Sequence, residues 1–139
     1  MLIENIRSAC GEDFIIGLAI SYSPGYSVSL SADDLCEIIS LHDATGDVDY
    51  VTCGFGSYLE FEGIIPAFTE GEKLTTPLTA RLKAVVKHAV ITSEAGVRTP
   101  DNAETILASG EADMVSIVRG QIADPHLARK VTEGRAEDI

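Results

Sequence analysis

Four short aliphatic runs, each followed by a segment with helical start signals, predict an α/β fold with four parallel strands. Runs of this kind are typical of strands in parallel sheets, because neighbouring elements cover both of their faces. A complete (β/α)₈ TIM barrel takes about 250 residues. The four units in these 139 residues therefore predict half of such a barrel. A flavodoxin-like open sheet is the alternative, but the Gly-rich first βα turn of its nucleotide-binding members is missing. The predicted strands are Phe14–Ile20, Val48–Cys53, Ala89–Thr92 and Ala112–Val118.

The predicted helices alternate with these strands, and the segment Leu2–Cys10 is the tail of an earlier helix. The helix starts, in chain order, are Ser31, Thr76-Pro77, Thr99-Pro100 and Asp124-Pro125. The serine opens a capping box that Asp34 completes. Proline is favoured in the first turn of a helix, where its missing N–H costs nothing. No domain boundary or low-complexity segment divides the chain. Residues 1–139 are therefore predicted to form one domain, equivalent to strands five to eight of the barrel.

Composition narrows the class of protein. The net charge of −12 makes nucleic acid and anionic lipid improbable partners. No run of about 18 apolar residues predicts a membrane helix, and the first residues do not resemble a signal peptide. The three histidines lack metal-ligand spacing, so no metal site is expected. Three cysteines without C-x-x-C spacing argue against disulfides and favour a reducing cytoplasm; they are Cys10, Cys36 and Cys53.

The loops that follow the strands are the predicted ligand site, because parallel α/β folds bind ligands at the C-terminal ends of their strands. In barrels a phosphate often lies between the last two of these loops. One of them, Ser93–Arg98, contains small residues that let backbone N–H groups approach an anion. The other contains Arg119, whose guanidinium suits a phosphate, although an arginine here could also be a plain surface residue.

A long linker, Gly54–Thr75, joins the second strand to its helix. Such loops in compact domains are lids or binding elements, or they are disordered. This one has aromatic side chains that line a flat ligand or, alternatively, cover the mouth of the barrel. They are Phe55, Tyr58, Phe61 and Phe68.

The final 28 residues, Ala112–Ile139, resemble the last strand and helix of the old yellow enzyme family of NADH:flavin oxidoreductases. The matching pattern is a strand, then Arg119, Ala-Asp-Pro, a lysine, Gly-Arg and Asp-Ile. The segments Gly11–Ser21 and Val48–Tyr58 resemble the fifth and sixth strands of the same family. The likeness is greatest to the branch of 2,4-dienoyl-CoA reductases and trimethylamine dehydrogenase. It implies FMN as cofactor, a small-molecule substrate and, as a further partner, NAD(P)H.

The same resemblance assigns roles to individual residues. Arg119, with the backbone of Val118, would hold the FMN phosphate, and Ala95 and Gly96 would supply the other phosphate loop. Many members of the family have an arginine at the position that Gly96 occupies in this sequence. Arg98, two residues later, is the candidate to replace that arginine. Tyr58 stands where the branch usually has a histidine near the substrate, and a phenol can donate a proton there, although its unperturbed pKa is about 10.

Two further positions depart from the family pattern. Ala19 stands where the family usually has a cation beside the flavin, and Phe55 stands where trimethylamine dehydrogenase has a catalytic carboxylate. The leading hypothesis is therefore the FMN-phosphate-binding portion of a flavin-dependent oxidoreductase, and this chain alone is expected to be inactive. The alternatives are a non-catalytic half-barrel, a subunit that completes a barrel with a partner chain, and an unrelated phosphate-binding α/β module.

The two exposed edge strands of half a barrel predict that the chain associates with another chain. Both edge strands are aliphatic and lack the lysine or proline that protects an exposed edge. Side chains expected to face the barrel interior would lose their opposing layer, which predicts a homo-oligomer or a missing half-barrel as partner. These side chains are Ile16, Leu18, Ile20, Val51 and Val115.

Overall fold

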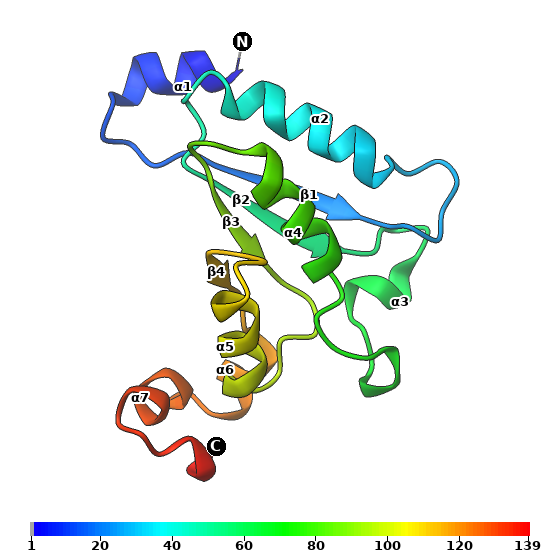
Figure 1. Ribbon diagram of the computed structural model, residues 1–139, viewed down its shortest axis with the longest axis vertical. Helices are drawn as coiled ribbons and strands as arrows, with labels where there is room; N and C mark the ends of the chain where they lie inside the picture. Colours follow the sequence, from blue (N-terminus) through cyan, green and yellow to red (C-terminus); the bar gives the residue numbers. More distant parts are fainter. Residues whose placement is uncertain (1) are drawn as a thin grey trace.

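The computed structural model describes residues 2–139 as one sheet with helices packed against it (Figure 1). The strands are β1 (Gly17–Tyr22), β2 (Tyr50–Phe55), β3 (Val90–Ser93) and β4 (Met114–Val115). The α-helices are α1 (Leu2–Cys10), α2 (Ala32–Asp43), α3 (Phe61–Ile64), α4 (Thr76–Val85), α5 (Pro100–Ala108), α6 (Arg119–Ala123) and α7 (Leu127–Thr132). Two short 3₁₀ turns are η1 (Phe68–Glu70) and η2 (Ala136–Asp138). None of the helices within residues 2–139 is long and apolar enough to cross a membrane.

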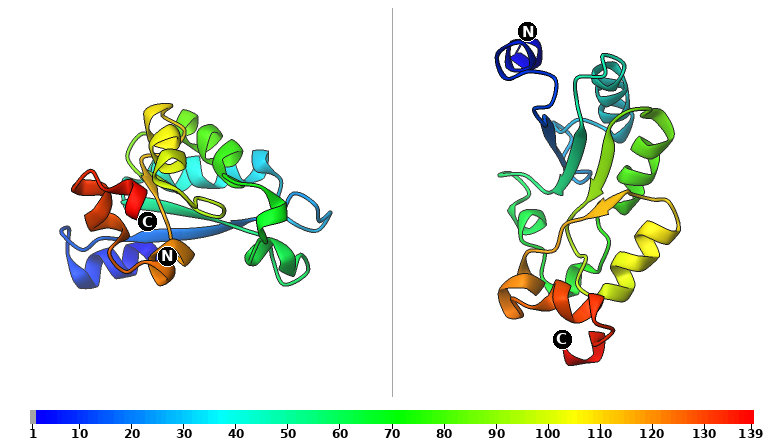
Figure 2. Two further views of the ribbon diagram at one scale, coloured as in Figure 1. Left: turned by 90° about the horizontal axis from the view of Figure 1, so that it is seen from below. Right: turned by 90° about the vertical axis from the view of Figure 1, so that its left-hand side faces the viewer.

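The sheet is parallel throughout and its order is β1-β2-β3-β4, as the sequence predicts. Consecutive strands are neighbours because each helix crosses back over the same face of the sheet. The helices α2, α4 and α5 all lie on that face (Figure 2). Each connection thus brings the C-terminal ends of all four strands to one edge of the sheet.

The first strand begins at Gly17 rather than at the predicted Phe14, because an arginine holds the preceding segment as a loop. Arg7 of α1 is nearly buried, and its Nη1 donates to the carbonyl oxygens of Glu12, at 2.8 Å, and Phe14, at 2.6 Å. Its Nη2 also reaches the carboxylate of Asp49 at 3.1 Å. Phe14 therefore lies outside the sheet and is exposed.

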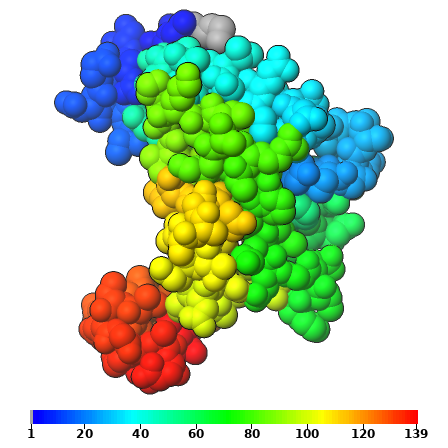
Figure 3. Space-filling model, viewed as in Figure 1, coloured from blue at the N-terminus to red at the C-terminus, as the bar shows by residue number. Residues whose placement is uncertain are grey.

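The other boundaries shift less, except near the C-terminus. Thr75, not Thr76, precedes α4, and its hydroxyl donates to the carbonyl oxygen of Glu94 instead of capping the helix. The caps at Ser31 and Thr99 form as predicted. The predicted last helix forms as α7, which begins two residues after Pro125, and a short additional helix, α6, precedes it. Both lie in a lobe beside α5 (Figure 3).

The main core lies between the sheet and the helices α2 and α4. Leu18, Ile20 and Val51 contribute to it, and Val115 packs into a second, smaller core beneath α5. The prediction that these side chains face the barrel interior is therefore wrong. Alternation along a strand fixes which residues share a face, but it does not say which face the helices cover. The buried members of the main core are Leu35, Cys36, Ile39, Val48, Val51, Cys53, Leu78, Leu82, Ala89 and Ile91.

The opposite face of the sheet carries small and polar residues. By strand register, Ala19, Thr52 and Thr92 stand in one row with Met114, which is 39% exposed. In the row before it, the ring of Tyr50 lies over Gly17, where a Cβ atom would come within 2.1 Å of the ring. This is the face that lines the interior of a closed barrel.

Candidate functional site

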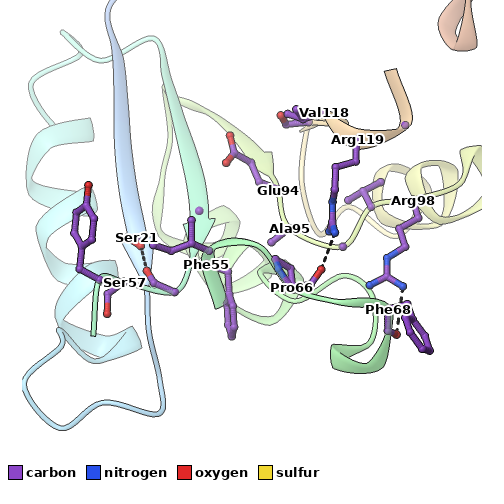
Figure 4. A pocket seen from close by; sticks show the side chains of 18 residues that line it. Ser21, Phe55, Ser57, Pro66, Phe68, Glu94, Ala95, Arg98, Val118 and Arg119 are labelled. Carbon is purple, nitrogen blue, oxygen red and sulfur yellow. Dashed lines mark hydrogen bonds between the residues drawn. The ribbon is translucent and has the colours of Figure 1, made fainter. Parts of the chain in front are cut away.

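A pocket of about 830 Å³ lies at the C-terminal edge of the sheet, and its wall contains Ser21 near the end of β1 and residues from the loops after the other three strands (Figure 4). A volume of this size suits a cofactor or a drug-sized ligand. The five predicted cofactor residues and the predicted catalytic residue all line it. They are Ala95, Gly96, Arg98, Val118, Arg119 and Tyr58. The structure thus brings the predicted residues together, while their roles towards a ligand stay predictions.

The loop after β3 has an unusual backbone that requires glycine. Ala95 and Gly96 both adopt positive φ angles, of 54° and 83°. The segment before α4 passes so close that a Cβ atom on Gly96 would lie 3.0 Å from Glu72 Cα and from Lys73 N. The carbonyl oxygens of Ala95 and Gly96 accept hydrogen bonds from Leu74 and Lys73, at 3.0 and 3.2 Å. Within residues 2–139 the N–H groups of Ala95 and Gly96 donate to no backbone carbonyl, so neither donor is used by the fold.

The two arginines of the pocket contact the long linker. Arg98 Nη2 donates to the carbonyl oxygens of Ala67 and Gly71, at 2.7 and 3.0 Å. Arg119 Nη1 donates to the carbonyl oxygen of Pro66 at 2.8 Å (Figure 4). Pro66 is the one hydrogen-bond partner of the Arg119 guanidinium among the described residues, which leaves most of its donors for an anion. Arg98 is instead an anchor for the linker.

The linker is ordered, with α3 and η1 inside it, rather than disordered. Gly56, at a φ of 83°, packs directly on the backbone of Gly63, where a Cβ atom would come within 2.4 Å. Phe55 lies edge-to-face on Tyr22, with ring centroids 6.2 Å apart. Phe55, Tyr58 and Phe68 line the pocket, whereas the exposed ring of Phe61 does not. Tyr58 is 92% exposed, so its phenol stands at the rim of the pocket.

Glu94 is the pocket residue that sequence reasoning missed. It directly follows β3, and its carboxylate accepts a hydrogen bond from the hydroxyl of Thr52 on the neighbouring strand. Burial, and after it the charge of Glu94, raises the pKa of the Cys53 thiol to about 12. Cys53 itself is buried in the core and does not line the pocket. The sequence did contain one signal for Glu94, because an acidic residue is unexpected within Ser93–Arg98, the loop predicted to bind an anion.

The sequence of residues 1–138 matches the NADH:flavin oxidoreductase / NADH oxidase family. Among curated proteins, it is 31% identical to the N,N-dimethylglycine/sarcosine dehydrogenase of Chromohalobacter salexigens, over 99% of this chain and 20% of that protein. It is 30% identical to the NADH oxidase of Thermoanaerobacter brockii, over 99% of this chain and 21% of that protein. The chain therefore spans about a fifth of the length of these relatives.

A solved structure has the same fold over nearly the whole chain. It is the 6-hydroxypseudooxynicotine amine oxidase of Pseudomonas geniculata N1, with a TM-score of 0.82 and 18% sequence identity. The match covers 99% of this chain and 20% of that one. At this identity the likeness shows the fold, and it agrees with part of a barrel rather than with a flavodoxin-like open sheet.

Proposed function

The chain belongs to the NADH:flavin oxidoreductase / NADH oxidase family, and on that premise we propose that it forms the part of an FMN-dependent oxidoreductase that binds the cofactor phosphate. The observation that carries the proposal is the convergence of Arg119 with the unpaired N–H groups of Ala95 and Gly96 on one pocket. Backbone N–H groups and a guanidinium are the donors that phosphate prefers. An unrelated phosphate-binding module is no longer an alternative.

The other pocket residues fit an elongated, partly aromatic ligand of this kind. Phe55 and Phe68 offer apolar surface for the flavin ring, and Gly54 and Gly56 keep the pocket open beside them. Bound FMN supplies the electron transfer, and this chain holds the phosphate and positions the ring. The names of the relatives, a dimethylglycine/sarcosine dehydrogenase and an NADH oxidase, support a small amine or a reduced nicotinamide as electron donor. Tyr58 would donate a proton only after a ligand or another segment covers its hydroxyl.

A second candidate is a non-catalytic half-barrel, or a subunit that completes a barrel with a partner. It is favoured by Ala19, which faces the open side of the sheet in register with Thr52 and brings no charge there. A cation aimed at the flavin would stabilise the charge that develops on reduction. Without one, this 139-residue chain is expected to show little reductase turnover.

The test of the proposal is the affinity of the chain for FMN, measured from the quenching of flavin fluorescence. Arg119→Ala removes a charge-assisted contact and should weaken FMN binding by about tenfold or more. Riboflavin, which lacks the phosphate, should bind both proteins equally. The control is Arg129→Ala, which removes the same charge from an exposed position of α7 outside the pocket. Unchanged FMN affinity in Arg119→Ala would end the proposal.

A further inference from the structure

The phosphate proposal leaves one charged group of the pocket unused, the carboxylate of Glu94. This side chain is half-buried, and Thr52 is its one hydrogen-bond partner among residues 2–139, where no cation pairs with it. A carboxylate can accept at about four lone-pair sites. A half-buried carboxylate with one protein donor can accept further hydrogen bonds from water or from the donor groups of a ligand.

The position of Glu94 says which part of a ligand would meet it. Its strand, β3, lies between β2, which ends at Phe55, and β4, which leads to Arg119. The close-up shows Phe55, Glu94 and Arg119 around the same pocket (Figure 4). If a ligand places its phosphate at Arg119 and its ring near Phe55, the part of the ligand that joins them therefore lies next to Glu94.

The neighbouring strand leaves room for such a ligand. A Cβ atom on Gly54 would lie 3.8 Å from Glu94 Oε2, so any larger residue there would stand in front of the carboxylate. The hydroxyl of Thr52 fixes the other oxygen, Oε1, from the neighbouring strand. Oε2 itself has no hydrogen-bond partner among residues 2–139 and lies beside Gly54 in the wall of the pocket, and the bond to Oε1 limits the rotation of the group.

We propose that Glu94 accepts hydrogen bonds from the hydroxyl groups of the polyol chain that joins the phosphate of FMN to its ring. This inference rests on the proposed function, because it takes the phosphate position from Arg119. Glu94 is then a residue that selects flavins by their polyol, and Thr52 is a positioning residue that holds its carboxylate.

The experiment compares three flavins on the full chain: FMN, riboflavin and lumiflavin, which keeps the ring but has no polyol. Glu94→Ala should weaken FMN and riboflavin by about tenfold and leave lumiflavin unchanged, since only the polyol loses its acceptor. Glu94→Gln keeps one acceptor oxygen and should lose less. The control is Glu104→Gln, which removes the same charge from an exposed position of α5. Thr52→Val should weaken FMN but not lumiflavin, a difference that a general loss of structure would not produce.

The outcomes separate this inference from the proposal beneath it. If the unaltered chain does not bind FMN, the proposed function fails and the role of Glu94 fails with it. If the chain binds FMN, and Glu94→Ala either changes nothing or weakens lumiflavin as much as riboflavin, only the role of Glu94 is overturned. Equal unfolding midpoints of the variants and the unaltered chain confirm that the affinities compare folded proteins.

Discussion

Replacing Asp43 with alanine should destabilise the chain strongly, although this residue lies far from the pocket. Asp43 is the last residue of α2 and is 3% exposed. Its carboxylate accepts three backbone N–H groups from the segment that leads into β3, those of Lys87, His88 and Ala89, at 2.6, 3.0 and 2.7 Å. These bonds fix the start of the strand whose other end carries the Glu94–Arg98 loop.

The expected size of the effect follows from these contacts. A hydrogen bond to a charged group is worth about 1.5–3 kcal/mol, and neighbouring bonds do not add fully. The N–H of Ala89 is buried and would be left without an acceptor, whereas Lys87 and His88 are exposed and their N–H groups can bind water. We therefore expect Asp43→Ala to lower the free energy of unfolding by about 3 kcal/mol, a large part of the stability of a small domain.

The loss should depend on pH in a defined direction. Burial opposes ionisation of Asp43, but the three N–H groups outweigh it and hold the pKa of the carboxyl below its ordinary value of 3.8. A carboxyl whose folded pKa is lowered contributes stability above its unfolded pKa and loses it as the pH falls through the folded pKa. The difference between the two proteins should therefore be full at pH 7 and shrink once the pH falls below 3.8.

Urea unfolding followed by circular dichroism measures this difference at each pH. Asp13→Ala is the matched control, because it removes the same charge from an exposed loop position before β1. It should change the free energy of unfolding by less than about 0.5 kcal/mol. An Asp43→Ala loss as small as that of the control, or a loss that grows on acidification, would refute the reasoning.

Three further predictions concern the loop after β3, the core and assembly. Gly96→Ala should lower the free energy of unfolding, measured in urea, by about 2 kcal/mol and should also weaken FMN binding. Gly46→Ala is the control and should lower it less, because Gly46 also has a positive φ, of 73°, but no atom lies within 4 Å of the added Cβ. In the native protein at pH 8, iodoacetamide should label the exposed Cys10 but not Cys53, which is buried and whose pKa is about 12. Mass spectrometry reads the labelling, and a labelled Cys53 in the native protein would contradict its burial. Because β1 and β4 are open edges, micromolar sedimentation should show an oligomer, and a cooperatively folded monomer of 14.8 kDa would disprove this.

The fold could be predicted because its signals are local. Aliphatic runs and helix caps such as Ser31 repeat four times, and short right-handed crossovers allow few orders of parallel strands. The face of the sheet could not be predicted, because Leu18 and Ala19 alternate whichever side the helices cover. The shortness of β4 and the additional helix α6 also had no clear signal.

The sequence could predict which loops form the pocket, but it could not predict which side chains contact one another there. The rule that ligands bind at strand ends selected the loops that contain Ala95, Gly96 and Arg119, and the family resemblance singled out these residues within them, without any knowledge of side-chain directions. Glu94 was passed over because only the hydrogen bond from Thr52, 42 residues away in sequence, shows that its carboxylate lies along the pocket. Contacts of that separation depend on strand register, which composition and spacing do not contain.

The linker decides how the two arginines can act. Arg98 already donates to the carbonyl oxygens of Ala67 and Gly71, so it can reach an anion only if it gives up neutral acceptors. A phosphate is a stronger acceptor than a carbonyl oxygen, so the exchange is favourable where the geometry permits it. Arg119 has a single bond of this kind and needs no such exchange. Arg119 should therefore contribute more than Arg98 to the affinity for phosphate. Arg98 should mainly hold the linker in place, so Arg98→Ala should loosen residues 66–71 more than it weakens FMN binding.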